Sequence, residues 1–394
     1  MKMSKLFAVL MISLLCGLFS NTRSVFANDG KKEANTRSLR ARRIIAGLEN
    51  RPNFWRVRTE EIIDLCQNVR KGKAEKIAST PAGLPVYAVF YGNFSEPVPQ
   101  SNWSAASSSS TWKSYYTRSG LPQTVLFCAG IHGAEAESVA AAVNLIQMME
   151  TGKDFRGQSD PELLNLIAQY RLIIIPCVNM DGRAISPDHL RKTSYEDFRK
   201  ASQGEWPDGS PIQWRESKEY FPLPLNKVSW PGGYPNSEGF NIMHDACPGH
   251  VRTAEARALL QLTERWNVDL LLNGHSCETA PFMLPPSALN YPAHVVRGND
   301  LTVKVNEAIC AAGLRESASK NPKNGNTFNL NTLATLASGA LSLTLECSVS
   351  CNYPPKKPYS YTFDQMMAPN FIALKTLLKD GLREPFVDRA KLFK

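Results

Sequence analysis

Four mostly apolar runs mark the chain, each of strand length and each bounded by polar residues, glycine or proline. They cover residues 125–129, 170–178, 268–275 and 340–346. Continuous apolar runs of this kind are typical of strands that are buried on both faces of a sheet. Segments of helical character lie between or after them, at residues 134–143, 254–266, 301–312 and 363–381. This alternation predicts an α/β fold, with a mixed, largely parallel central sheet and helices on both faces.

The segments outside this alternation differ in composition. Residues 38–71 have an amphipathic helical pattern, and residues 75–80 and 86–91 flank a Pro-Ala-Gly turn and predict a hairpin. Residues 93–120 are rich in serine and predict an exposed loop. Residues 194–238 are rich in Trp, Pro and Gly, and so long a stretch inside a domain is usually functional or an insertion. We therefore expect one domain that carries an insertion at about 194–238.

The N-terminus has the features of a secretory signal peptide. Lys2 and Lys5 precede the apolar stretch Leu6–Phe19, and small residues up to Ala27 offer a cleavage site. The apolar stretch is short for a membrane span, and no later segment is long and apolar enough for one. The sequence therefore predicts a signal peptide at 1–27, a secreted or periplasmic protein without a membrane span, and a single domain at 28–394.

Charge and cysteine content narrow the function classes. The chain has 45 Lys and Arg against 36 Asp and Glu, and these residues are scattered. Because a nucleic-acid surface needs a clustered basic stripe, we expect no nucleic-acid partner.

The eight cysteines that follow the expected leader permit disulfides in an exported protein. Cys128, Cys177 and Cys347 lie in strand-like runs, however, and are equally interpreted as buried thiols.

Three of the apolar runs lead into ionisable residues. The first is followed by His132 and Glu135, and the others end at His275 and Glu346. Taken alone, the His-x-x-Glu spacing also fits a surface histidine and a first-turn glutamate favoured by the helix dipole. Ligands of open α/β sheets, however, bind beyond the carboxyl ends of the strands. Two histidines and one glutamate supply the three protein ligands of a catalytic zinc, and the second glutamate supplies a base.

Ordered motifs extend this pattern along the chain. They are GIHGAE (130–135), VNMDGR (178–183), LRKT (190–193), LLNGHS (271–276) and LTLECS (343–348). Together with the expected hairpin, these segments resemble the zinc carboxypeptidase family, of the carboxypeptidase A type, from about residue 77 to the C-terminus.

The resemblance implies a carboxypeptidase-like fold and a zinc metallocarboxypeptidase that hydrolyses a peptide or amide bond. It implies that His132, Glu135 and His275 bind one Zn²⁺ per chain. It also implies that Glu346 is the catalytic base and that Arg191 polarises the scissile carbonyl. The expected partner is therefore a peptide or small amide substrate.

One position departs from the family pattern. Met243 and His244 occupy the place of an Asn-Arg pair that holds the substrate's terminal carboxylate in the family. Arginine is always charged, whereas histidine is largely neutral near pH 7. A protonated His244 predicts substrate affinity that weakens as the pH rises from about 6 to 8. The other interpretations are that the clamp has been lost, or that Arg252 or Arg257 supplies the charge.

This departure leaves other functions open. The first is a zinc-dependent deacylase or amidase that acts on a small acylated amino acid or a cell-wall peptide. The second is a non-catalytic exported binding protein, which is disfavoured because Glu346 and all three expected ligands are present.

Overall fold

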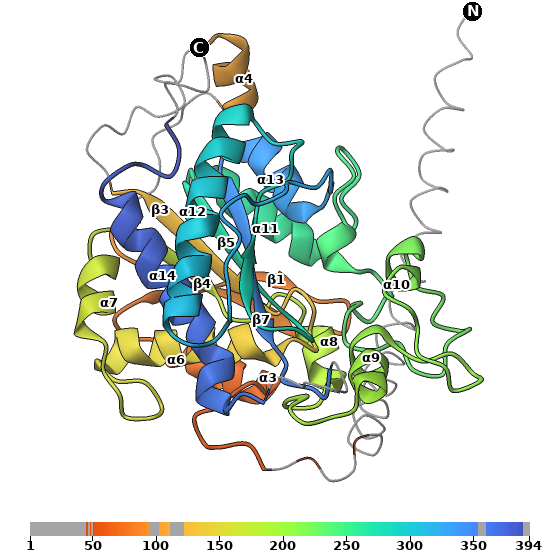
Figure 1. Cartoon of the computed structure of the whole chain (residues 1–394). Coiled ribbons are helices and arrows are strands. Elements are labelled where there is room, and N and C mark those ends of the chain that lie inside the picture. The colour runs from red at the N-terminus through yellow and green to blue at the C-terminus, as the bar shows by residue number, and fades with distance from the viewer. Residues whose placement is uncertain are drawn as a thin grey trace, which may run out of the picture.

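The computed structural model describes residues 45, 48, 50–94, 102–110, 122–353 and 360–388. The expected signal peptide at 1–27 lies outside these described residues. A seven-stranded sheet with the order β1-β2-β4-β3-β5-β7-β6 forms the centre of the fold (Figure 1). Its strands are β1 Lys73–Ser79, β2 Pro85–Tyr91, β3 Thr124–Ala129, β4 Arg171–Ile175, β5 Leu270–Cys277, β6 Phe282–Leu284 and β7 Leu341–Ser348.

The sheet is mixed, with a parallel centre and antiparallel edges. Strands β4, β3, β5 and β7 pair in parallel. The hairpin β1–β2 and the short strand β6 add antiparallel neighbours at the two edges. Every residue of β3 and β4 is buried, as their continuous apolar sequences require. The predicted fold class is therefore confirmed, and β6 is an edge strand that the sequence pattern did not indicate.

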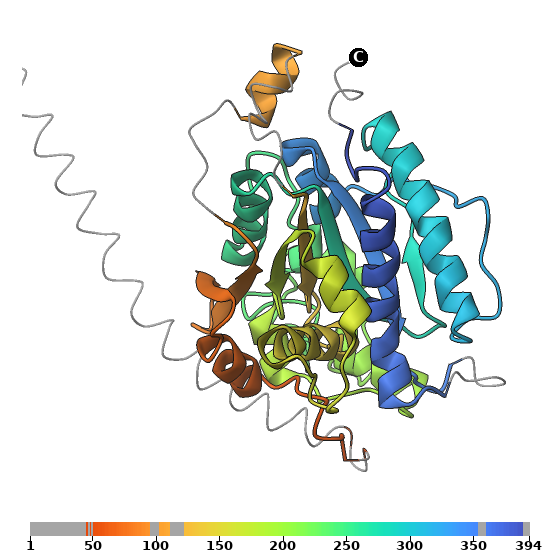
Figure 2. The ribbon, with the colours of Figure 1, turned by 90° about the vertical axis from the view of Figure 1, so that its left-hand side faces the viewer.

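Helices cover both faces of this sheet. Helices α6, α12 and α14 pack on one face, and α11 and α13 pack on the other (Figure 2). The helices are α3 Thr59–Gln67, α4 Trp103–Ser108, α6 Ala136–Thr151, α7 Pro161–Ile167, α8 Met180–Ile185, α9 Tyr195–Gln203, α10 Glu216–Glu219, α11 Ala254–Arg265, α12 Pro292–Ala311, α13 Leu330–Ser338 and α14 Phe363–Gly381, with a 3₁₀ turn η1 at Ile242–His244. Helix α14 has the bounds that its amphipathic pattern predicts, because Thr362 and Gln365 form a capping box at its start.

Two helices differ from the sequence-based expectation. Helix α12 begins at Pro292 rather than at residue 301. Its first turns bury His294 and Arg297, and these polar residues interrupt the apolar pattern. Arg297 is stabilised there by an ion pair of 2.6 Å with Asp380. In the serine-rich segment, helix α4 forms because Asn102 caps its N-terminus and Trp103 is buried.

The cysteines following the expected leader all fall within the described residues, and all eight are free thiols. Cys128, Cys177 and Cys347 are fully buried in the core, in agreement with the buried-thiol interpretation. Burial raises the pKa of Cys177 to about 12, so this thiol stays protonated near neutral pH. No helix in the described part of the chain is long and apolar enough to cross a membrane.

Candidate metal site and cavity

Three buried donor residues converge beyond the carboxyl ends of β3 and β5. His132 follows β3, Glu135 is the N-cap residue of α6, and His275 lies in β5. Glu135 bridges the two rings, with 2.8 Å from Oε1 to His132 Nδ1 and 3.0 Å from Oε2 to His275 Nδ1. One ligand atom from each residue lies within 4.8 Å of the others, and no other such group of three occurs among the described residues.

The turn that carries His132 depends on glycines. Gly130 has a φ of +62°, a conformation that L side chains rarely adopt. Gly133 is even more restricted, because a Cβ atom there would lie 2.2 Å from the backbone nitrogen of Arg183. The Gly133 N–H also donates to the carbonyl of Gly233 at 2.8 Å, which ties the turn to the insertion. The motif glycines therefore let three segments meet at the donor site.

The electrostatics of the site favour an ionised carboxylate between the two imidazoles. Burial alone raises the pKa of Glu135, but the charges of His132 and His275 outweigh it and lower the pKa to about 2. Burial lowers the pKa of His132 despite its hydrogen bond with Glu135. A carboxylate oxygen and two imidazole nitrogens are the donor set of catalytic zinc sites, so these residues fit a zinc ion.

Asn241 orients His132 from the other side of its ring. Asn241 Oδ1 lies 3.2 Å from His132 Nε2 and also accepts a hydrogen bond from the backbone of Met243. Because this oxygen is an acceptor, Nε2 keeps its proton when His132 binds a metal, and Nδ1 gives up its proton and offers its lone pair to the ion. The ring of Tyr234 stacks on the face of the His132 ring, with 4.0 Å between the ring centroids.

We expect Asn241→Leu to weaken zinc binding ~10- to 100-fold, the usual effect of losing such a supporting hydrogen bond. Asn241→Asp retains the acceptor and serves as the matched control. A competition titration against a chromophoric chelator measures both dissociation constants. An unchanged zinc affinity in the leucine variant would contradict the role of Asn241.

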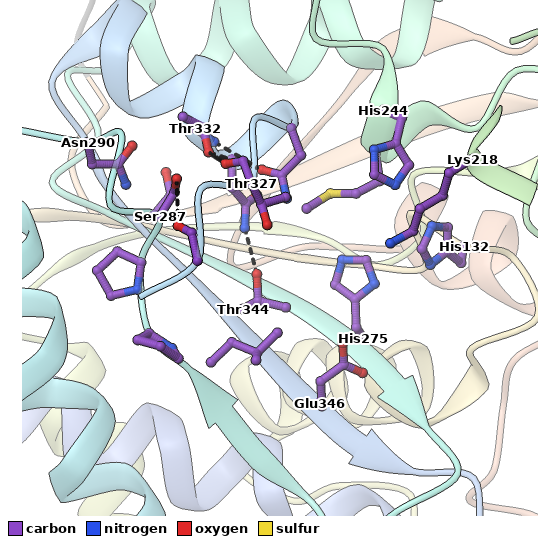
Figure 3. A pocket seen from close by; sticks show the side chains of 18 of the residues that line it. His132, Lys218, His244, His275, Ser287, Asn290, Thr327, Thr332, Thr344 and Glu346 are labelled. Carbon is purple, nitrogen blue, oxygen red and sulfur yellow. Dashed lines mark hydrogen bonds between the residues drawn. The ribbon is translucent and has the colours of Figure 1, made fainter. Parts of the chain in front are cut away.

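Glu346 lies beside the donor site. Strands β5 and β7 pair in parallel with His275 and Glu346 in register. Both residues line a cavity of about 320 Å³, together with His132 (Figure 3). Burial raises the pKa of Glu346 to about 7, and the carboxylates of Glu135 and Glu278 contribute to this increase. A carboxylate with such a pKa is suited to exchange protons near neutral pH.

The zinc carboxypeptidase sequence profile matches residues 75–341, which is more than half of the chain. The chain belongs to the zinc carboxypeptidase family. Solved structures agree with this membership at the level of fold. A protein of Shewanella denitrificans OS-217, provisionally described as carboxypeptidase A, superposes with a TM-score of 0.50 and 14% identity, over 82% of this chain and 69% of the other. Thrombin-activatable fibrinolysis inhibitor gives a TM-score of 0.50 and 13% identity, over 91% of this chain and 81% of the other. No curated protein matches the sequence.

Met243 and His244, at the position where this family member departs from the expected pattern, both line the cavity. Burial, together with the nearby His132, Lys218 and His275, lowers the pKa of His244 to about 3. A pKa this low keeps His244 neutral near pH 7, which argues against a protonated histidine clamp that titrates between pH 6 and 8.

The arginines singled out in the sequence do not line this cavity. Arg191 donates from Nε to the carbonyl of Tyr361 at 2.5 Å, and its guanidinium lies over Phe363. Arg252 packs over Phe221 and Phe240. Arg257 donates to two backbone carbonyls at the start of α11. A role for Arg191 at the carbonyl stays a prediction.

Sequence reasoning missed several residues of the cavity. Lys218 and Trp214 come from the insertion, and Tyr234 lies at its end. The rest of the lining combines the apolar residues Leu284, Pro285 and Pro286 with small polar side chains, namely Ser287, Asn290, Thr327, Asn329, Asn331, Thr332, Ser342 and Thr344. Asn241 carried a usable signal, since it precedes Met243 by two residues, whereas the insertion has no periodicity that places its side chains.

Proposed function

We propose that the chain is an exported zinc metallopeptidase that hydrolyses a peptide or amide bond. In this proposal residues 28–394 form one catalytic domain, with the insertion at about 194–238 as part of the site. The observation that carries the proposal is the convergence of His132 Nδ1, Glu135 and His275 Nδ1, with Glu346 in the same cavity.

His132, Glu135 and His275 would hold the single zinc ion. When bound, zinc would lower the pKa of a water molecule and polarise the substrate carbonyl. Glu346 accepts a proton from the attacking water and delivers it to the leaving amine. Its pKa of about 7 suits both steps, because the group must gain and lose a proton in each cycle. The neutral His244 offers a hydrogen bond to the substrate but no charge.

A second candidate function uses the same chemistry on a smaller substrate. The chain would then be a zinc-dependent deacylase or amidase of an acylated amino acid or a cell-wall peptide. Met243 and His244, which replace the expected Asn-Arg pair in the cavity lining, favour this candidate. A purely non-catalytic binding role is disfavoured, because the donor set and Glu346 lie together.

A digest of a mixed library of peptides and acylated amino acids, read by mass spectrometry, tests the proposal. We expect cleavage that a chelator abolishes and that added zinc restores. Release of single C-terminal residues would identify a carboxypeptidase, and release of acyl groups would identify the deacylase. Cleavage that resists the chelator, or no cleavage of either substrate class, would contradict the zinc hydrolase.

A further inference from the structure

The cavity has a positive charge where the expected arginine is missing. No arginine lines it among the described residues, and its charged side chains other than histidine are Lys218, Lys323 and Glu346. The two lysines are therefore the side chains of this cavity that can hold an anionic group of a substrate by a permanent charge.

Lys218 is the lysine beside the donor site. It belongs to α10 in the insertion and extends toward His132 and His275 (Figure 3). Its ammonium lies 3.7 Å from the centroid of the Trp214 ring. Lys218 and Glu346 line the same cavity and attract each other, but among the described residues the ammonium forms no ion pair within contact distance. Burial lowers the pKa of Lys218, and the charge of Glu346 acts against this. The contact with Trp214 thus positions the ammonium without pairing it with a carboxylate.

Stacked aromatic rings connect Lys218 to the donor site. The rings of Trp214 and Tyr234 are in edge contact, with their centroids 5.9 Å apart. Tyr234 in turn stacks on His132, with an angle of 9° between the ring planes. Tyr234 is buried, so this series of contacts links Lys218 to the core beside the proposed metal ligands. The insertion therefore has the structure of a specificity element.

Lys323 occupies a different part of the cavity. Its neighbour Asn324 donates to the carbonyl of Pro286 at 2.8 Å, next to Ser287. Ser287 lies at the end of the cavity that is opposite Lys218 (Figure 3). Lys323 is therefore a matched control for a general effect of positive charge in the cavity.

We infer that Lys218 binds a carboxylate of the substrate beside the scissile bond, in place of the missing arginine. This inference rests on the proposed function and specifies its substrate class as amides that carry a free carboxylate on the leaving amine. The ammonium and a carboxylate form a charge-assisted hydrogen bond, which an amide of the same shape cannot form.

The inference can be tested by binding, without turnover. The probes are mercaptopropionate and mercaptopropionamide, whose thiolates bind zinc while their other ends differ only in charge. Calorimetry on the zinc-loaded protein should show that the acid binds ~10- to 100-fold more tightly, the range for a hydrogen bond to a charged group. Lys218→Met should remove this preference, whereas Lys218→Arg and Lys323→Met should keep it.

The other outcomes separate the alternatives. Equal binding of acid and amide to the wild type, or an intact preference in Lys218→Met, would overturn the inference and leave the zinc site standing. A wild type that binds neither thiol would instead contradict the proposed zinc chemistry. In turnover, Lys218→Met should raise KM for a free-acid substrate and not for its amide. An equal loss of kcat on both would assign Lys218 to the carbonyl oxygen and overturn the carboxylate role.

Discussion

Glu346→Gln is expected to slow hydrolysis at least ~10²-fold, or ~2.7 kcal/mol in activation free energy, while the zinc content is unchanged. Glutamine has the shape of glutamate but cannot accept a proton from water. Glu346 is not one of the three converging donors, so its replacement leaves the metal ligands intact. Steady-state kinetics and metal analysis of the same preparation measure the two effects.

Glu278→Gln is the matched control for this variant. Glu278 is close enough to raise the pKa of Glu346, yet it is not among the residues that line the cavity. We expect the Glu278→Gln variant to hydrolyse the substrate nearly as fast as the wild type. Near wild-type turnover in Glu346→Gln itself would mean that another group is the base.

The pH dependence gives a second readout for Glu346. The protonated carboxyl cannot act as a base, so kcat/KM of the wild type should fall as the pH drops below the pKa of Glu346. That pKa is about 7 in the metal-free site, and a bound dication would move it lower. The fall of kcat/KM at acidic pH should therefore have its midpoint below pH 7. Any residual activity of Glu346→Gln should not show this fall.

The core of the fold and the donor set could be predicted because each is encoded in a short segment. The apolar run of β3 leads directly into His132 and Glu135, and the runs of β5 and β7 contain His275 and Glu346. Parallel pairing then brings the ends of these strands together without further information. One contiguous segment of sequence was therefore enough to predict each strand and the donor residue that it carries or leads into.

The substrate side of the cavity could not be predicted in this way. Lys218 is linked to His132 through Trp214 and Tyr234, by contacts between residues that are distant in sequence. Arg191 was selected from its motif, but its guanidinium faces Tyr361 and Phe363, which come from the other end of the chain. Motif spacing fixes which residues are near a turn, whereas tertiary packing decides where a long side chain points.

We expect the wild type to bind one zinc ion per chain, and His132→Ala and His275→Ala each to lose it. Either change leaves only two of the three donors, and Glu135 then faces a single imidazole. His250→Ala, at an exposed position outside the donor group, is the control and should retain zinc.

Metal analysis after dialysis decides the zinc assignment, and thermal unfolding with and without zinc supports it. A ligand that binds only the folded state at 100 times its dissociation constant stabilises that state by ~2.7 kcal/mol. Added zinc should therefore raise the Tm of the metal-free wild type and of His250→Ala. It should leave the Tm of the other two variants unchanged, because their remaining donors bind the ion too weakly.

Circular dichroism shows whether these variants are folded, so that a loss of zinc is not confused with unfolding. Full zinc content in both His132→Ala and His275→Ala would place the metal elsewhere, and Glu346 would then lose its assigned role as well.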